Sequence, residues 1–152
     1  MSTKDLQRLI RETEGEEARF AELMTDFCRL YSSTFRERMP VYPLVQVVHL
    51  SGHRYLRWRW VDEEGRHRAV NFFKTEDRVL LADLPLITRA AVLQFWMDSL
   101  ELNGDFAAAR TRRTKLMQCL TQLQSARRVM EEMVPRETLR QALQAVKVGV
   151  LH

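Results

Sequence analysis

Apolar residues in the first quarter of the chain have the spacing of one helix face. Over the first 38 residues they recur every three or four positions, which places their side chains on one side of an α-helix. Ser2 or Thr3 can cap the start by accepting a hydrogen bond from a backbone N–H, and Gly15 is a candidate break point. Pro40 disfavours helical geometry in the residue before it, so we predict that the helix ends there.

The pattern then changes to the alternation and β-branched composition of strands. LVQVVHL (44–50), RYLRWRWV (54–61) and RHRAVNFF (66–73) are the three predicted strands. Short polar turns separate them, and each turn contains a glycine at a position suited to unusual backbone dihedrals. Three strands joined by two short turns predict an antiparallel meander.

Helical spacing returns for the rest of the chain. Asp83 can cap a helix that Asn103-Gly104 would stop, because both residues tolerate left-handed geometry. A second helix is predicted from about Phe106 to Met133 and a short third helix after Pro135. The predicted buried positions are Leu86, Ala90, Leu93, Trp96, Met97 and Leu100, then Phe106, Ala109, Leu116, Met117, Leu120, Leu123 and Met130, and finally Leu139, Leu143 and Val146.

These elements predict a single α+β domain over residues 1–152. Its N-terminal helix and three-stranded antiparallel meander would be followed by C-terminal helices packed on one face of the sheet. The charged N-terminus lacks the apolar centre of a signal peptide, and no run is long and apolar enough for a transmembrane helix. We therefore expect a cytoplasmic protein without membrane contact.

Arginines alternate with apolar residues in the second and third predicted strands. If residues 62–65 form the whole turn, Arg59 lies opposite Arg68, and directly opposite residues share a face. The predicted face carries Arg57, Arg59, Arg66 and Arg68, bordered by Tyr55 and Phe72. The other face would carry Leu56, Trp58, Trp60, Ala69 and Phe73 and pack on the helices.

Such a face has charges for phosphates and rings for stacking, so it is a candidate nucleic-acid surface. The alternative is that these arginines occupy ordinary exposed strand positions, where their stems cover apolar surface. Opposed arginines also suit an acidic protein partner, because like charges on one face are unfavourable unless neutralised.

A second basic cluster lies in the predicted long helix. Residues 106–128 contain six basic and no acidic residues. Arg110, Arg112 and Lys115 are candidate nucleic-acid contacts, whereas Arg113 points towards the apolar side. The alternative is an intramolecular partner, for which the glutamates of the first helix are the best candidates.

Motifs of catalysis and metal binding are not seen. The chain has no Gly-rich phosphate loop, nucleophile elbow or paired carboxylates, and its histidines lack zinc-site spacing. Cys28 and Cys119 are expected to be small buried hydrophobic residues. We expect neither an enzyme nor a bound cofactor or metal.

Three segments resemble a known family. The run VYPLVQVV (41–48), then YLRWRW (55–60), then a helix with LELN (100–103) before a basic stretch resembles uncharacterised proteins encoded on integrating conjugative elements and plasmids, over roughly residues 10–130. The order of helix, strands and helix is similar to that of MobI-type accessory proteins of conjugative transfer. The resemblance implies a mobile-element protein without catalytic residues, and it carries over no binding site.

Two functions follow as hypotheses. One is a non-enzymatic accessory protein that binds DNA or a DNA-processing complex through its basic surface. The other is a protein-binding inhibitor of a host defence complex, for which an exposed apolar or acidic patch, such as the Glu-rich first helix, would be the contact. A homodimer through the long helices, whose methionines pack adaptably, is compatible with either hypothesis.

Overall fold

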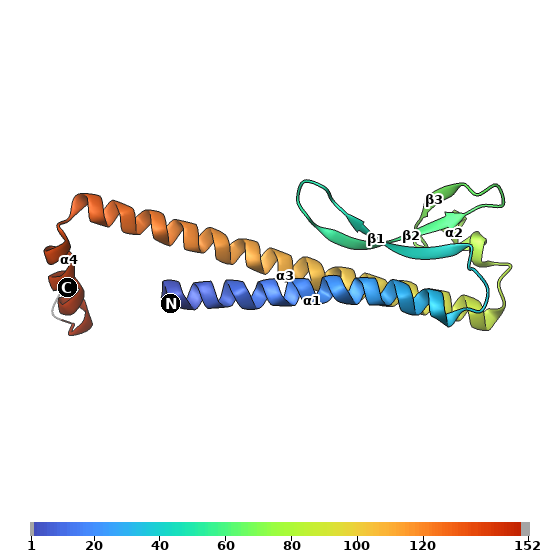
Figure 1. The fold of residues 1–152 in the computed structure, drawn as a ribbon, viewed down its shortest axis with the longest axis horizontal. Helices are drawn as coiled ribbons and strands as arrows, with labels where there is room; N and C mark the ends of the chain where they lie inside the picture. The colour runs from blue at the N-terminus through green and yellow to red at the C-terminus, as the bar shows by residue number, and fades with distance from the viewer. Residues whose placement is uncertain (1, 150–152) are drawn as a thin grey trace. The chain divides into compact units, whose positions relative to one another are not determined.

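The computed structural model describes residues 2–149 and shows helices and one three-stranded sheet (Figure 1). The elements in chain order are α1 (Thr3–Thr34), β1 (Val41–Val47), β2 (Arg54–Val61), β3 (His67–Val70), α2 (Thr75–Arg78), the 3-10 turn η1 (Val79–Leu81), α3 (Leu86–Met133) and α4 (Arg136–Lys147). The strands form an antiparallel sheet in the order β1-β2-β3. The predicted α+β class, with a helix, a three-stranded meander and then helices, is confirmed.

The chain forms two compact units. One unit is Arg11–Arg113 and contains the whole sheet, and the other combines the first ten residues with residues from Thr114 onwards. The prediction of a single domain over residues 1–152 stays a prediction. Within residues 2–149, no helix combines the length and apolar character needed to cross a membrane.

Helix α1 begins at a reciprocal cap. Ser2 Oγ accepts the backbone N–H of Asp5 at 3.1 Å, and the Asp5 carboxylate accepts the backbone N–H of Ser2 at 3.0 Å. These bonds with Ser2 hold the pKa of Asp5 below its usual range. The helix then continues through Gly15 without a break.

The end of α1 comes earlier than the sequence predicts. The helix stops at Thr34 rather than at Pro40. The hydroxyls of Ser33 and Thr34 donate to the carbonyl of Leu30, at 3.0 and 2.7 Å. Such side-chain bonds offer the backbone an alternative to the helical ladder. The released residues let β1 begin at Val41, three residues before its predicted start.

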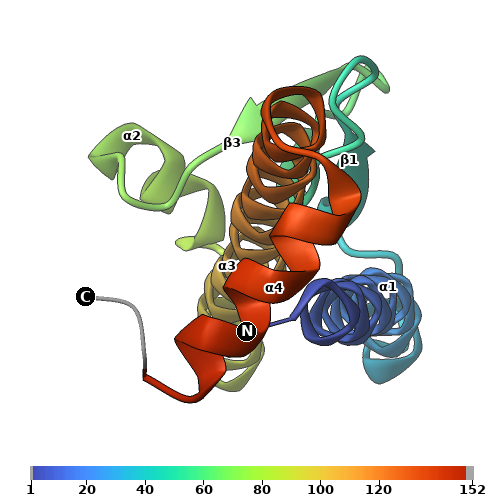
Figure 2. The same cartoon turned by 90° about the vertical axis from the view of Figure 1, so that its left-hand side faces the viewer.

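The inner face of the sheet forms the core of the Arg11–Arg113 unit. Val41, Leu56, Trp58 and Val70 are buried there. Segments of α1 and α3 lie side by side beneath this face (Figures 1 and 2). The rings of Tyr31 and Trp58 meet edge to face with centroids 5.2 Å apart. The prediction that the tryptophans belong to the core is confirmed for Trp58.

Two buried polar groups fix this packing. Trp58 Nε1 donates to Ser99 Oγ at 2.9 Å, and that hydroxyl donates to the Trp96 carbonyl at 2.6 Å. Tyr31 donates its hydroxyl to the Val41 carbonyl at 2.6 Å, and burial raises its pKa. The Trp58 N–H and the Tyr31 hydroxyl are therefore both paired, which avoids the cost of leaving them unsatisfied.

The predicted register of β2 and β3 is wrong by one residue. Val61 pairs with His67, so the turn contains five residues, 62–66, instead of four. Asp62 Oδ1 accepts the backbone N–H groups of Glu64 and Arg66, at 2.9 and 2.8 Å. Gly65 has a φ of 80°. A turn followed by a left-handed glycine adds one residue to the second strand, which changes the face of every β3 side chain.

The third strand is also shorter than predicted and ends at Val70. Asn71 follows it in a turn, where its Oδ1 accepts the backbone N–H of Phe73 at 3.0 Å. This turn directs Phe72 into the core, where it is 2 % exposed, and leaves Phe73 64 % exposed. The sequence-based assignment of Phe72 to an open face and Phe73 to the core is therefore wrong.

Helix α3 is continuous where two helices are predicted. Asn103-Gly104 lies within it and does not stop it. The Asn103 amide bonds the backbone of Leu56 in β2, accepting its N–H at 2.6 Å and donating to its carbonyl at 3.0 Å. Asn103 thus pairs with the free edge of β2 beyond the end of β3. Its side chain therefore stabilises the sheet and does not cap a helix.

The buried face of α3 also differs from the predicted stripe. Its buried residues are Val92, Ser99, Phe106 and Ala109. Leu86 and Met97, both predicted to be buried, are 75 % and 57 % exposed. The face is rotated because Ser99 and Asn103, two polar residues, point at the sheet to bond Trp58 and Leu56.

Further predictions of burial are wrong. In α3, the exposed residues that were predicted to be buried also include Ala90, Leu100, Met117, Leu123 and Met130. Leu143 and Val146 of α4 are exposed. Cys119 is exposed, while Cys28 is half-buried and burial raises the pKa of its thiol; neither forms a disulfide. In α3 and α4, the helical spacing of apolar residues therefore predicts burial for side chains that the other described residues leave exposed.

Replacing Gly104 by alanine should raise the free energy of unfolding by about 0.5–1 kcal/mol, because glycine costs that much inside a helix. A Cβ at Gly104 would meet no atom within 4 Å. Gly65→Ala is the contrasting variant and should destabilise, because its positive φ disfavours any side chain. Urea unfolding of both variants would test this. Destabilisation by Gly104→Ala would contradict this expectation, because it would indicate that residue 104 has the left-handed geometry of a helix end.

Candidate nucleic-acid interface

The outer face of the sheet is directed away from α1 and α3. Strand alternation and the observed register place on this face Tyr42, Leu44 and Gln46 from β1, Tyr55, Arg57, Arg59 and Val61 from β2, and His67 and Ala69 from β3. None of these strand residues is acidic. The face therefore combines positive charge with aromatic rings and has no carboxylate of its own.

Arg57 and Arg59 are the central cations of this outer face, and both are half-buried. Within residues 2–149, neither guanidinium has a carboxylate oxygen within 4.0 Å. Arg59 Nη2 donates to the His67 carbonyl at a long 3.4 Å, and its buried Nε has no hydrogen-bond partner there. The two charges are thus held close to the sheet without being neutralised.

Aromatic side chains border the two arginines. Tyr42 and His67 lie on the two outer strands, and the Tyr42 hydroxyl is 2.5 Å from His67 Nδ1. In the register of the sheet, Tyr42 lies opposite Arg59 and His67 lies opposite Val61, so this contact spans β2 diagonally. Tyr55 stacks on His53 with ring centroids 6.1 Å apart and an interplanar angle of 24°. Flat rings beside cations can stack bases while the cations bind phosphates.

Tyr42 and His67 are absent from the residues predicted from sequence. The predicted first strand begins at Leu44, after the Tyr42-Pro43 pair. β1 is an edge strand, however, and proline is tolerated there. Starting the strand at Val41 would have placed Tyr42 opposite Arg59. His67 lies on the outer face because the turn has five residues, so the predicted four-residue turn placed it on the other face.

Arg66 and Arg68 do not join Arg57 and Arg59. Arg66 lies in the turn and forms an ion pair with Glu64. Arg68 lies opposite Trp60, on the inner face, and its Nη1 is 3.1 Å from Asp77 Oδ1. The predicted patch of four arginines is therefore wrong, and so is the placement of Phe72 at its border.

Asp77 connects α2 to the end of β3. Its Oδ2 accepts the backbone N–H of Asn71 at 2.8 Å, and its Oδ1 accepts from Arg68. The bond from Asn71, and to a lesser degree the pairing with Arg68, holds the pKa of Asp77 below its ordinary value of 3.8. The folded state therefore prefers the ionised carboxylate.

This preference predicts a pH dependence of stability. A lowered folded pKa stabilises the protein above pH 3.8, and this contribution is lost as pH falls through the folded pKa. In urea unfolding, Asp77→Asn should be less stable than the wild type near neutral pH, and the difference should shrink as pH falls below 3.8. A difference that is constant with pH would contradict this role of the carboxylate.

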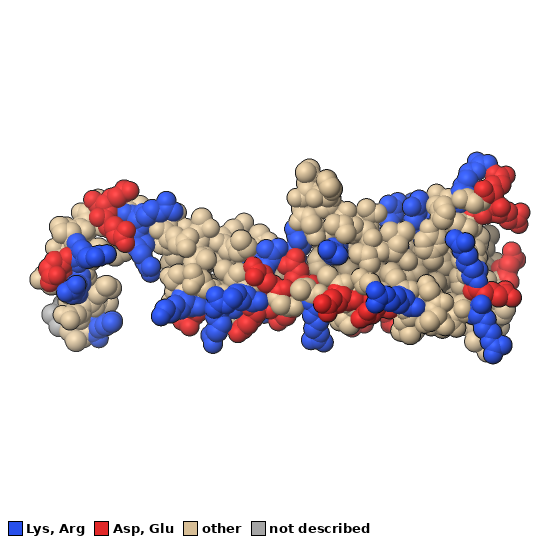
Figure 3. Space-filling model, viewed as in Figure 1, with Lys and Arg blue, Asp and Glu red and all other residues tan. Residues whose placement is uncertain are grey.

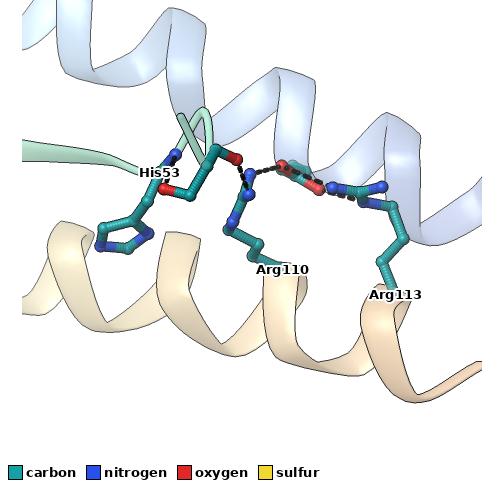
Figure 4. A network of polar contacts seen from close by, with 5 residues as sticks. His53, Arg110 and Arg113 are labelled. Atoms are coloured by element: carbon teal, nitrogen blue, oxygen red, sulfur yellow. Dashed lines mark hydrogen bonds and ion pairs between the residues drawn. The ribbon is translucent and has the colours of Figure 1, made fainter. Parts of the chain in front are cut away.

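The second basic cluster has an intramolecular partner (Figure 4). Arg110 and Arg113 of α3 bind the Glu17 carboxylate, at 3.1 and 2.6 Å. Arg110 also donates to the Ser51 carbonyl in the turn between β1 and β2, where Ser51 Oγ accepts the backbone N–H of His53 at 3.2 Å. The expected pairing with the Glu-rich first helix is confirmed for these two arginines, and it joins α1, α3 and the turn.

Arg112 and Lys115 are exposed on α3. In the view of Figure 3, acidic and basic side chains lie intermixed along α1 rather than in separate patches. Arg112 and Lys115 remain predicted contacts that no feature of the structure distinguishes from ordinary surface residues. Among the predicted cations, Arg57 and Arg59 alone combine partial burial with the absence of a carboxylate partner within the described chain.

The outer face offers two cations and several aromatic rings. The described residues contain no group of three or more His, Cys, Asp or Glu side chains that could hold a metal ion. Comparison with known proteins gives no relative: no protein-family model matches the chain, and neither curated proteins nor solved structures show a significant similarity to it.

Proposed function

We propose that the protein is a non-enzymatic accessory protein of a mobile genetic element that binds single-stranded DNA in the cytoplasm through the outer face of its sheet. The observation that carries the proposal is the pair Arg57 and Arg59, half-buried on a face without carboxylates and flanked by Tyr42 and Tyr55. The mobile-element context rests on the resemblance of the VYPLVQVV, YLRWRW and LELN segments.

Single-stranded DNA fits this face better than a duplex. Unpaired bases can stack on exposed rings, which contributes about 1–3 kcal/mol per base, while arginines bind the phosphates. A duplex is usually read by a helix or a two-stranded ribbon inserted in the major groove. The arginines here lie on the central strand of a three-stranded sheet, and neither projects from an element that could enter a groove.

Arg110 and Arg113 of the helical basic cluster do not contribute in this proposal. The Glu17 carboxylate already binds Arg110 and Arg113. The same ion pairs remove one carboxylate, that of Glu17, from the Glu-rich first helix that the alternative function, an inhibitor of a host defence complex, would present to its partner. DNA binding by the sheet is therefore the better supported function.

Fluorescence anisotropy with labelled single- and double-stranded oligonucleotides tests this function. We expect micromolar or tighter binding to single strands at about 50 mM salt, weaker binding to duplex of the same length, and a steep loss of affinity with added salt. Absence of binding by the folded protein at low salt would overturn the proposal. A preference for duplex would overturn its single-strand part.

A further inference from the structure

A second surface of the Arg11–Arg113 unit is an apolar groove between α1 and α3. From α1 it is lined by Leu23, Asp26, Phe27 and Leu30, and from α3 by Asp98, Glu101, Leu102 and Asp105. Because the sheet's outer face points away from both helices, this groove is separate from the proposed DNA surface. These eight residues form the interhelical groove.

The floor of the interhelical groove is apolar and accessible. Leu23 and Leu30 are 38 % and 58 % exposed. Phe27 and Leu102 are half-buried and pack below against the core cluster of Met24, Leu56 and Phe106. The floor is therefore supported from within the core, while its upper surface is open to a partner.

The rim of the interhelical groove is acidic. Asp98, Glu101 and Asp105 are exposed and lie three and four positions apart on one ridge of α3. Like charges at this spacing destabilise a helix by a few tenths of a kcal/mol per pair. In the described part of the chain, Glu101 and Asp105 have no cation within 4.0 Å. Asp98 accepts a hydrogen bond from the Gln94 amide at 2.9 Å.

The fourth rim carboxylate, Asp26 on the α1 side, has a weak partner. Arg29 lies 3.6 Å from it, but both side chains are mostly exposed, at 78 % and 65 %. Exposed pairs of this kind contribute little, about 0–1 kcal/mol. The rim therefore presents negative charge on both sides of an apolar floor.

We propose that the interhelical groove binds a basic amphipathic helix of a partner protein. Leu23, Phe27 and Leu30 have the i, i+4, i+7 spacing of one helix face, and the groove extends along two helical turns, about 10 Å. A third helix laid between two others inserts apolar residues at the same spacing. Lysines or arginines beside those residues would meet the carboxylates of both rims.

The probe for this proposal is a synthetic helical peptide of about 18 residues, five turns, with leucines along one face and lysines on the others. Its affinity is measured by fluorescence anisotropy of a labelled peptide. One control peptide has the same composition, with the leucines spread around the helix. A second control peptide has glutamate in place of lysine.

The protein variants separate the groove from general charge attraction. Glu101→Lys/Asp105→Lys reverses two rim charges, and Glu12→Lys/Glu16→Lys makes the same change of charge at exposed positions of α1 outside the groove. We expect the rim variant to bind the amphipathic peptide at least about tenfold more weakly. The matched variant should bind it within about twofold of the wild type, and neither control peptide should bind comparably.

Three results would overturn the proposal. One is no binding of the amphipathic peptide by the folded wild type. Another is an equal loss of affinity in both charge-reversed variants, or equal binding of the peptide with dispersed leucines, since either would indicate unspecific attraction. The third is a wild-type dimer in sedimentation that Leu30→Asp converts to a monomer, which would assign the groove to a second copy of the chain.

Discussion

Replacing Glu17 by alanine should lower the free energy of unfolding by about 2–4 kcal/mol. Its side chain is 15 % exposed, and its carboxylate binds the guanidinium groups of two arginine side chains that are each 22 % exposed. Removing the anion would leave Arg110 and Arg113 as neighbouring cations with little access to water, and breaking a buried ion pair is costly for that reason. Urea unfolding followed by tryptophan fluorescence would measure the loss.

The exposed neighbour Glu16 provides the control for this prediction. Glu16→Ala removes the same charge from the same turn of α1 and should change stability by less than about 0.5 kcal/mol. The double variant Glu17→Ala/Arg113→Ala should lose less than the sum of its single variants, because the two groups interact directly. Equal effects of Glu17→Ala and Glu16→Ala would show that the cluster does not hold α1, α3 and the turn together.

Asn103→Ala should destabilise the protein by about 2–4 kcal/mol. The variant removes both hydrogen bonds to Leu56 and leaves a partly buried N–H and C=O of the central strand unpaired. Each unsatisfied backbone group costs about 1–3 kcal/mol. Besides the loss in urea unfolding, hydrogen exchange of the Leu56 amide should become faster relative to amides paired between β1 and β2.

Asn103→Asp separates the two bonds. Aspartate keeps an oxygen that accepts the Leu56 N–H but loses the donor to the Leu56 carbonyl, which then faces a carboxylate. We expect it to destabilise as well, while its Leu56 amide stays better protected than in Asn103→Ala. If Asn103→Ala has wild-type stability and unchanged exchange at Leu56, the amide does not anchor the strand.

Much of the fold follows from local patterns in the sequence. Alternating apolar residues predict β2 with its observed bounds, Arg54–Val61, because one face of that strand covers the core. Helical spacing predicts helix over most of α1, α3 and α4, although it divides α3 into two helices. Of the two candidate caps of α1, Ser2 and Thr3, Ser2 accepts the backbone N–H of Asp5. These features depend on neighbours within a few residues, which a single sequence contains.

The features that were predicted wrongly depend on contacts over longer distances. Asn103-Gly104 has the composition of a helix stop. The Asn103 side chain, however, hydrogen-bonds the backbone of Leu56, which lies 47 residues earlier in the chain. Glycine alone does not end a helix when tertiary packing supports it. The LELN and YLRWRW segments, two of the three segments of the family resemblance, are joined by the two hydrogen bonds between Asn103 and Leu56. No local rule connects these segments.

The candidate site was predicted in part. Alternation correctly placed Tyr55, Arg57 and Arg59 on one face of β2, since that grouping does not depend on the neighbouring strand. The assignment of β3 residues depended on the length of one turn, and the Asp62 side chain and Gly65 added a residue to it. A single-residue error was enough to exchange Arg68 for His67 on the outer face.

The two proposed surfaces would serve different partners. The outer face of the sheet has unpaired arginines and rings for DNA, and the interhelical groove has carboxylates and apolar residues for a basic helix. A protein that binds both could hold a partner beside a single strand, as an accessory factor of DNA processing would. Either surface can be tested without the other.

The most direct measurement of the central claim is the salt dependence of single-stranded DNA binding in two double variants. Each arginine that neutralises a phosphate of a single strand contributes about 0.7 to the slope of log K against log salt. Arg57→Ala/Arg59→Ala should therefore reduce the slope by about 1.4 and lower affinity at least tenfold at about 50 mM salt. Arg66→Ala/Arg68→Ala removes the same charge from residues that already pair with Glu64 and Asp77, so its slope should match the wild type. Equal reductions in the two variants, or none in either, would contradict the assignment of DNA binding to the outer face of the sheet.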